Sequence, residues 1–164
     1  PSLRPNQLFA VSLPHSALTP EQRRAVVDVC AGHLVTSHGL RSLAPGEPGY
    51  TGHYGGDRRT RDAAYHQGTV WGWLIGPFVR AHQRVYGDPE LARSFLYPLL
   101  YQLRSHGVGS LSEVFDGDAP FTPRGCFAQA WTVAEVLGAW QATVRYAGID
   151  TIEEPVEEGG DGDA

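Results

Sequence analysis

The chain has 164 residues, of which 41% are hydrophobic and 19% charged, enough apolar material for one globular core. Its formal net charge of −5 argues against a nucleic-acid-binding protein, and its longest basic cluster, Arg58-Arg59-Thr60-Arg61, is typical of a salt-bridged loop. No apolar run is long enough to span a membrane. Neither nucleic acid nor a membrane is therefore an expected partner.

The two cysteines, Cys30 and Cys126, lie far apart in apolar helical patterns. This placement predicts two buried thiols and a reducing, cytoplasmic location. The chain contains no methionine, even at its first position, so we expect it to be a piece of a longer protein.

Two helices are predicted near the N-terminus. The first is short and covers residues 8–13. The second begins at Thr19-Pro20-Glu21-Gln22, where the threonine can cap the helix and the glutamine can complete a capping box. Apolar residues recur at helical spacing over residues 26–34, which places His33 in the core, and Gly39 is expected to close the segment.

Residues 40–67 show neither a helical nor a strand period. A connection of that length in a compact domain is usually functional when it is ordered. Its glycines alternate with aromatic and histidine side chains, among them Tyr50, Tyr54, Tyr65 and His66. A disordered segment would contain fewer aromatic residues.

Three more helices are predicted in the second half of the chain. The first covers Thr69–Tyr86, is apolar nearly all round at its start, and should bend at Pro77. The next begins at Asp88, which can act as its cap, and ends before Gly107. The last covers Gly125–Tyr146 and is strongly apolar, with Trp140 in the core.

The predicted architecture is therefore all-α, with about five helices over residues 1–150 and no convincing strand. Two long loops carry aromatic and polar residues. Compact helical bundles have short connections, so long loops favour an α/α toroid, in which inner and outer helices alternate. Residues 151–164 are acidic and rich in glycine, and we expect them to form a disordered tail.

The second long loop, residues 107–123, carries Glu113 between the apolar residues Leu111 and Val114. A carboxylate held among apolar residues on a loop between two helices is a candidate general base. The alternative is that Glu113 caps a nearby helix and that Asp116 and Asp118 are solvated turn residues.

Other chemistries receive less support from the sequence. His53, Asp57, Asp62 and His66 follow no metal-ligand spacing, so no metal site and no cofactor are predicted. Neither cysteine lies in a basic, exposed context, and no serine occupies a nucleophile-elbow motif. Sugar binding fits better, because hexose rings stack on aromatic side chains while their hydroxyl groups need polar partners.

Four blocks, in this order, resemble the C-terminal region of glycogen debranching enzymes. They are Arg4–Leu13, Gly49–Tyr54, Arg61–Trp71 and Ser112–Asp118, and Cys126–Trp131 follows them. The resemblance implies the C-terminal part of an (α/α)6 toroid with amylo-α-1,6-glucosidase activity. The substrate would be a branched α-glucan such as glycogen or its limit dextrin, hydrolysed with inversion.

The resemblance also implies that Glu113 is the general base. The general acid would be an aspartate in an Arg-Asp-Thr-type motif upstream of Pro1, in the missing N-terminal part of the same domain. The 164-residue chain alone is therefore expected to be inactive. Gly72 departs from the family pattern, in which proline is common between the two tryptophans.

The residues expected to bind the sugar lie on the first long loop and at helix starts. The candidates are Tyr50, Tyr54, His66, Gln67 and Trp71, with Arg4, Asn6, Gln7 and Gln129 at helix starts facing the same end of the toroid. Trp131, which follows Gln129, is a further aromatic residue that could contact the sugar. For Trp131 and Trp73 the alternative to sugar binding is ordinary packing in the core. Two other functions stay open: another α/α-toroid glycosidase, of glucoamylase, trehalase or processing-glucosidase type, and a non-catalytic carbohydrate-binding helical domain.

Overall fold

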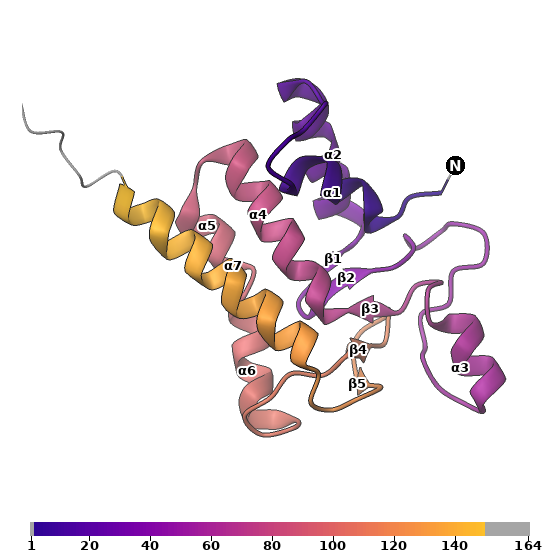
Figure 1. The fold of residues 1–164 in the computed structure, drawn as a ribbon. Helices are drawn as coiled ribbons and strands as arrows, with labels where there is room; N and C mark the ends of the chain where they lie inside the picture. The colour runs from indigo at the N-terminus through magenta and orange to yellow at the C-terminus, as the bar shows by residue number, and fades with distance from the viewer. Residues whose placement is uncertain (1, 150–164) are drawn as a thin grey trace, which may run out of the picture.

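The computed structural model describes residues 2–149, so the predicted tail of residues 151–164 lies outside the described residues. Most helices pack together on one side of the molecule, a small sheet lies at one end of them, and the helix of residues 58–64 lies on the other side of that sheet (Figure 1). The helical elements are the 3₁₀ helix η1 (Pro5–Leu8), α1 (Phe9–Ser12), α2 (Pro20–His33), α3 (Arg58–Ala64), the 3₁₀ helix η2 (Gly72–Leu74), α4 (Ile75–Tyr86), α5 (Pro89–Ser94), α6 (Tyr97–Ser105) and α7 (Ala130–Ile149).

The predicted start of α2 is confirmed. Thr19 accepts a hydrogen bond from the backbone N–H of Gln22, and the Gln22 side chain accepts one from the backbone of Thr19, which is a complete capping box. The predicted end of α2 is wrong. The helix stops at His33, which is exposed, and Leu34 takes the buried position after it.

A five-stranded antiparallel sheet, in the order β1-β2-β3-β4-β5, corrects the all-α prediction. Each strand has only two or three residues, too few for the alternation that identifies a strand in a sequence. Gly39 lies in β2 with φ +142°, and a side chain there would collide with the carbonyl of Trp71. The strands are β1 (Val35–Thr36), β2 (Gly39–Arg41), β3 (Val70–Trp71), β4 (Val114–Phe115) and β5 (Pro123–Arg124).

The sheet also changes the predicted helix over Thr69–Tyr86. This segment begins as β3, turns through η2, and becomes α-helical only at Ile75. Pro77 then falls in the first turn of α4, where its missing N–H costs no hydrogen bond within that helix.

Three other predicted boundaries differ from the structure. Residues 88–107 form two helices, α5 and α6, of which α5 is capped as expected by Asp88. The connection of residues 40–67 contains α3, whose first turn is capped by Asp57. Helix α7 begins at Ala130, because residues 125–129 pass beside Glu113 before they reach the helix.

Helix α4 is the centre of the core, as its apolar circumference predicted. Ile75, Phe78, Val79 and Ala81 are fully buried. The helix contacts α1, α2, α5 and α7, which surround it in Figure 1. Within residues 2–149, no helix has the length and apolar character that crossing a membrane requires.

Candidate functional site

The sheet brings Glu113 between two segments that are distant in sequence. Glu113 directly precedes β4, and its backbone carbonyl accepts a hydrogen bond at 3.3 Å from Gly72, the residue after β3. Its backbone N–H donates at 2.8 Å to the carbonyl of Cys126, which follows β5. The residue is half-buried, and its backbone position is set on both sides.

Both carboxylate oxygens of Glu113 accept hydrogen bonds from the protein. Oε1 accepts from the hydroxyl of Tyr65, and Oε2 accepts from the backbone N–H of Cys126 at 3.0 Å. Gly125 has φ +63°, and a side chain there would lie 2.6 Å from Oε2, so glycine leaves room for the carboxylate. The carboxylate of Glu113 bonds to the Tyr65 hydroxyl and to the backbone N–H of a loop residue, Cys126, and not to the first turn of a helix. The alternative in which Glu113 caps a helix is therefore wrong.

Four aromatic rings form a cluster that contacts this carboxylate through Tyr65. The ring of Tyr65 lies 4.6 Å from that of Trp71, 5.0 Å from that of His66 and 5.5 Å from that of Tyr54, measured between centroids. His66 and Trp71 are stacked with an interplanar angle of 1° and 5.3 Å between centroids. The structure thus gathers three predicted residues, Tyr54, His66 and Trp71, around Tyr65, the residue that contacts the predicted base.

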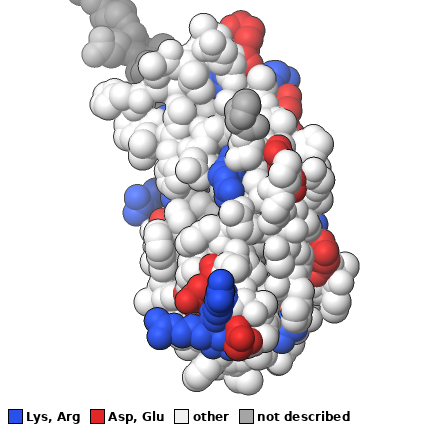
Figure 2. All heavy atoms as spheres, turned by 90° about the vertical axis from the view of Figure 1, so that its right-hand side faces the viewer, with Lys and Arg blue, Asp and Glu red and all other residues white. Residues whose placement is uncertain are grey.

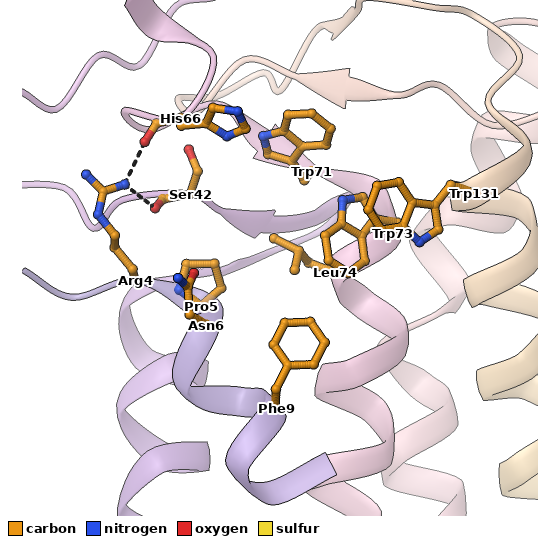
Figure 3. Close-up of a pocket in the computed structure, with 10 residues that line it drawn as sticks. All are labelled: Arg4, Pro5, Asn6, Phe9, Ser42, His66, Trp71, Trp73, Leu74 and Trp131. Carbon is orange, nitrogen blue, oxygen red and sulfur yellow. Dashed lines mark hydrogen bonds between the residues drawn. The ribbon is translucent and has the colours of Figure 1, made fainter. Parts of the chain in front are cut away.

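A pocket of about 310 Å³ opens beside this cluster (Figure 3). Four of the predicted sugar-binding residues are among its lining, which consists of Arg4, Pro5, Asn6, Phe9, Ser42, His66, Trp71, Trp73, Leu74 and Trp131. Glu113 is not one of the lining residues. Trp71 belongs to both features, because it lines the pocket and packs against Tyr65, which contacts Glu113.

The polar predicted residues at the pocket edge are bonded to the protein. The guanidinium group of Arg4 donates to the carbonyls of Ser42 and His66, at 3.0 and 2.7 Å, and to Oε1 of Gln67 at 2.8 Å. Figure 3 shows the two carbonyl bonds as dashed lines. The Gln7 side chain donates to the carbonyl of Arg4 at 3.0 Å. These contacts tie the N-terminal segment to the first long loop and so build the pocket wall.

Gln129 and Tyr50 lie outside this lining. Gln129 is half-buried directly before α7, and its backbone N–H donates to the carbonyl of Leu111. The hydroxyl of Tyr50 donates to Oδ1 of Asp118 at 2.7 Å, which ties the first long loop to the second. Burial, and then the bond to Asp118, raises the pKa of Tyr50 to about 12, so its hydroxyl remains a donor at neutral pH.

Asp116 is buried, which corrects its interpretation as a solvated turn residue, whereas Asp118 is exposed. The Asp116 carboxylate accepts from the backbone N–H of Tyr54 at 2.8 Å and from the guanidinium group of Arg124. Burial by itself raises the pKa of Asp116, but the hydrogen bonds from Arg124 and Tyr54 outweigh it and hold the pKa below its ordinary value. Asp116 is therefore an ionised anchor for the loop that carries Tyr54.

The basic run of residues 58–61 lies in α3. Arg58 pairs with Asp62 at 3.7 Å, and both side chains are largely exposed. Charged side chains of both signs gather over the α3 end of the molecule in Figure 2, and most of the rest of that face is uncharged. In the part of the chain that the structure describes, no three His, Cys, Asp or Glu side chains are grouped so that they could hold a metal ion.

The sequence leaves Trp131 open between sugar binding and core packing. It is 50% exposed and stacks on Trp73 with 4.1 Å between ring centroids, so the core alternative is wrong. Three other residues of the site, Trp73, Tyr65 and Ser42, were not among the predicted site residues. The repeat of tryptophan on both sides of Gly72 is a signal that could have identified Trp73. Tyr65 lies inside one of the four blocks, but no local pattern distinguishes it from the other tyrosines. No sequence pattern indicates that Ser42 would line the pocket.

The cysteines differ from each other, contrary to prediction. Cys30 is buried as expected, and burial raises the pKa of its thiol to about 12. Cys126 is exposed, because residues 125–129 form a loop and not the first turn of α7.

The half-buried Glu113 carboxylate, the aromatic cluster and the pocket lie among the loops of a helix-rich chain, an arrangement that suits a ligand with apolar ring faces and polar edges, such as a sugar. The sequence profile described as amylo-alpha-1,6-glucosidase matches residues 1–138, and the chain belongs to this family. It is 27% identical over 158 residues to the glycogen debranching enzyme of Saccharomyces cerevisiae. That alignment covers 82% of this chain and 10% of the relative, so the chain spans about a tenth of the length of the yeast enzyme. The resemblance stated from the sequence blocks is confirmed.

Proposed function

We propose that this chain is part of a glycoside hydrolase that removes α-1,6-linked glucose at the branch points of glycogen or its limit dextrin, with inversion at the anomeric carbon. The observation that carries the proposal is the carboxylate of Glu113, held by two donors beside the Tyr65–Trp71 aromatic pair. Family membership supports the substrate class.

In this mechanism Glu113 is the general base. An inverting glycosidase uses one carboxylate to activate water while a carboxylic acid on the opposite side of the bond protonates the leaving oxygen, with the two carboxyl groups ~6.5–9.5 Å apart. Both Glu113 oxygens keep one lone pair after bonding to Tyr65 and Cys126, since a carboxylate oxygen has two. A lone pair is therefore available to accept the proton of the attacking water.

The general acid, in this proposal, comes from an earlier part of the complete enzyme. The four aspartates of the two long loops all have other roles. Asp116 is an ionised anchor, Asp118 accepts from Tyr50, Asp57 caps α3 and Asp62 pairs with Arg58. Each of these carboxylates already has a partner within the protein, so none of the four is our candidate for the acid.

The pocket would hold the sugar next to this base. Trp71, Trp73 and Trp131 offer apolar faces to the sugar rings, and Asn6 and His66 offer polar groups to the hydroxyls. Tyr54 joins the same wall through Tyr65. Arg4, Gln7 and Gln67 would support this wall, and Tyr50 and Gln129 would contact the branched glucan at its edges.

The test is Glu113→Gln in the complete enzyme, assayed by glucose release from a branched limit dextrin. An amide keeps the shape of the side chain but cannot accept the proton, so we expect a loss of ~10²–10⁴-fold in kcat. Binding of the dextrin should be largely retained. The control is Glu90→Gln, an exposed position in the first turn of α5, which should leave the rate unchanged. If Glu113→Gln keeps more than half of the activity, Glu113 is not the base.

A further inference from the structure

The proposed base has a neighbour whose hydroxyl points at it. Tyr65 follows α3, and its O–H donates to Oε1 of Glu113, 48 positions away in the sequence. This is a side-chain donor to the Glu113 carboxylate, and Oε2 is held separately by the backbone N–H of Cys126. Together the two donors define the plane of the carboxylate.

The ring of Tyr65 is itself held in place. It packs against Trp71, His66 and Tyr54 at centroid distances of 4.6, 5.0 and 5.5 Å. The indole Nε1 of Trp71 donates to the backbone carbonyl of Tyr65 at 3.0 Å, so backbone and ring are both attached to β3. A tyrosine fixed at both ends can fix the direction of the group to which it donates.

The local fold explains why the hydroxyl reaches this point. Asp57 caps the first turn of α3, and the hydroxyl of Thr69 donates to the carbonyl of Ala64 at 2.8 Å at its other end. Ala64 is buried, so the end of α3 is docked against the protein. Tyr65 takes the next position and turns toward the sheet.

The charge states suit this contact. Burial, and then the hydrogen bond to Glu113, raises the pKa of Tyr65 above the ordinary value of a tyrosine. The phenol therefore keeps its proton at the pH at which a glycosidase works, and it donates to the carboxylate throughout. A hydroxyl that keeps its proton is a permanent donor, so the Glu113 carboxylate has a fixed partner while it acts as a base.

We propose that Tyr65 is a positioning residue for the reaction: its hydroxyl orients the Glu113 carboxylate and keeps it ready to accept a proton from water. This inference rests on the proposed function, because it assigns Tyr65 a role only through Glu113. The residue does not need to touch the sugar for this role. A displaced base loses rate without losing substrate, which separates this role from sugar binding.

The experiment is Tyr65→Phe in the complete enzyme, since phenylalanine keeps the ring packed on Trp71 and removes only the hydroxyl. We expect kcat to fall about 10- to 100-fold with KM nearly unchanged. The control is Tyr86→Phe, which removes a hydroxyl that donates to Asp28, between α4 and α2. This control should change neither kcat nor KM.

A double variant separates the possible outcomes. If Tyr65 acts through Glu113, adding Tyr65→Phe to Glu113→Gln should cost little beyond the single Glu113→Gln loss, because residues that act as a unit are not additive. Additive losses, or a higher KM with kcat unchanged, would overturn the positioning role and indicate direct contact with sugar. An inactive Glu113→Gln with a fully active Tyr65→Phe would overturn this inference and leave the proposed function intact. An active Glu113→Gln would overturn both. Thermal melts of each variant identify a loss that comes from unfolding.

Discussion

Asp116 and Arg124 form a double hydrogen bond next to the β4–β5 pair, with Nε of Arg124 3.2 Å from Oδ1 and Nη2 3.0 Å from Oδ2. The same carboxylate accepts from the backbone N–H of Tyr54 and lies 3.3 Å from Nδ1 of His53. One buried aspartate thus joins the first long loop to the second. The position of Tyr54 in the aromatic cluster depends on this junction.

We expect Asp116→Asn to lower the free energy of unfolding at neutral pH by about 1–3 kcal/mol, since it weakens a buried, charge-assisted set of hydrogen bonds. The folded-state pKa of Asp116 is lowered, so its stabilisation is fully present above the unfolded pKa of about 3.9 and is lost as pH falls through the folded pKa. The variant should therefore lose less stability than the wild type on acidification. Urea melts at neutral and acidic pH test this. Asp62→Asn, in the exposed pair on α3, is the control and should change neither value.

Trp71→Ala should weaken binding of a branched dextrin, whereas Trp140→Ala should not. Trp71 lines the pocket, while Trp140 is half-buried on α7 against Arg93 and Tyr97. A lost ring stack costs about 0.5–1.5 kcal/mol, which is up to about tenfold in affinity. Trp140→Ala should instead reduce the free energy of unfolding, by at most about 3–5 kcal/mol.

Titration in the Glu113→Gln background of the complete enzyme measures this binding without turnover of the dextrin. Thermal melts of the same variants report stability. The reverse ranking, with weaker binding in Trp140→Ala, would show that the pocket is not the sugar site.

The two thiols should react at very different rates with an aromatic disulfide reagent. Cys126 is exposed and should be modified quickly in the native 164-residue chain. Cys30 is buried, and its raised pKa keeps it as an unreactive thiol, so it should react only after denaturation. Cys126→Ser should remove the fast phase and leave the slow one. Two fast thiols in the native chain would contradict the burial of Cys30.

The 164-residue chain expressed alone should self-associate and release no glucose. Leu137 and Val144 of α7 are 58% and 48% exposed and lie two helical turns apart on one face. Exposed apolar stripes of this kind favour association in water. Light scattering after size exclusion should detect oligomers, and replacement of both residues by glutamine should reduce them. Leu13→Gln, at an equally exposed leucine after α1, is the control. A monomer with glucosidase activity would contradict the prediction.

Local sequence was sufficient wherever the interacting residues are close in the chain. The capping box of Thr19 and Gln22 and the Asp88 cap were predictable, because a cap is made within three positions. The apolar circumference of α4 likewise indicated its central place in the core. The order of the four blocks was sufficient to identify the family, since four short patterns in one order are far more specific than one.

Contacts between residues far apart in the chain could not be predicted from the sequence. The strands are too short to show a period, and β3 pairs with β4 across more than forty positions, so only the folded backbone reveals the sheet. The bond between Tyr65 and Glu113 spans 48 positions, and nothing near Tyr65 distinguishes it from the other tyrosines of its loop. The sequence by itself determined that Glu113 is a candidate base in a glucosidase family. Tertiary structure decided which groups hold its carboxylate, because hydrogen-bond partners across a sheet are chosen by geometry in space and not by spacing along the chain.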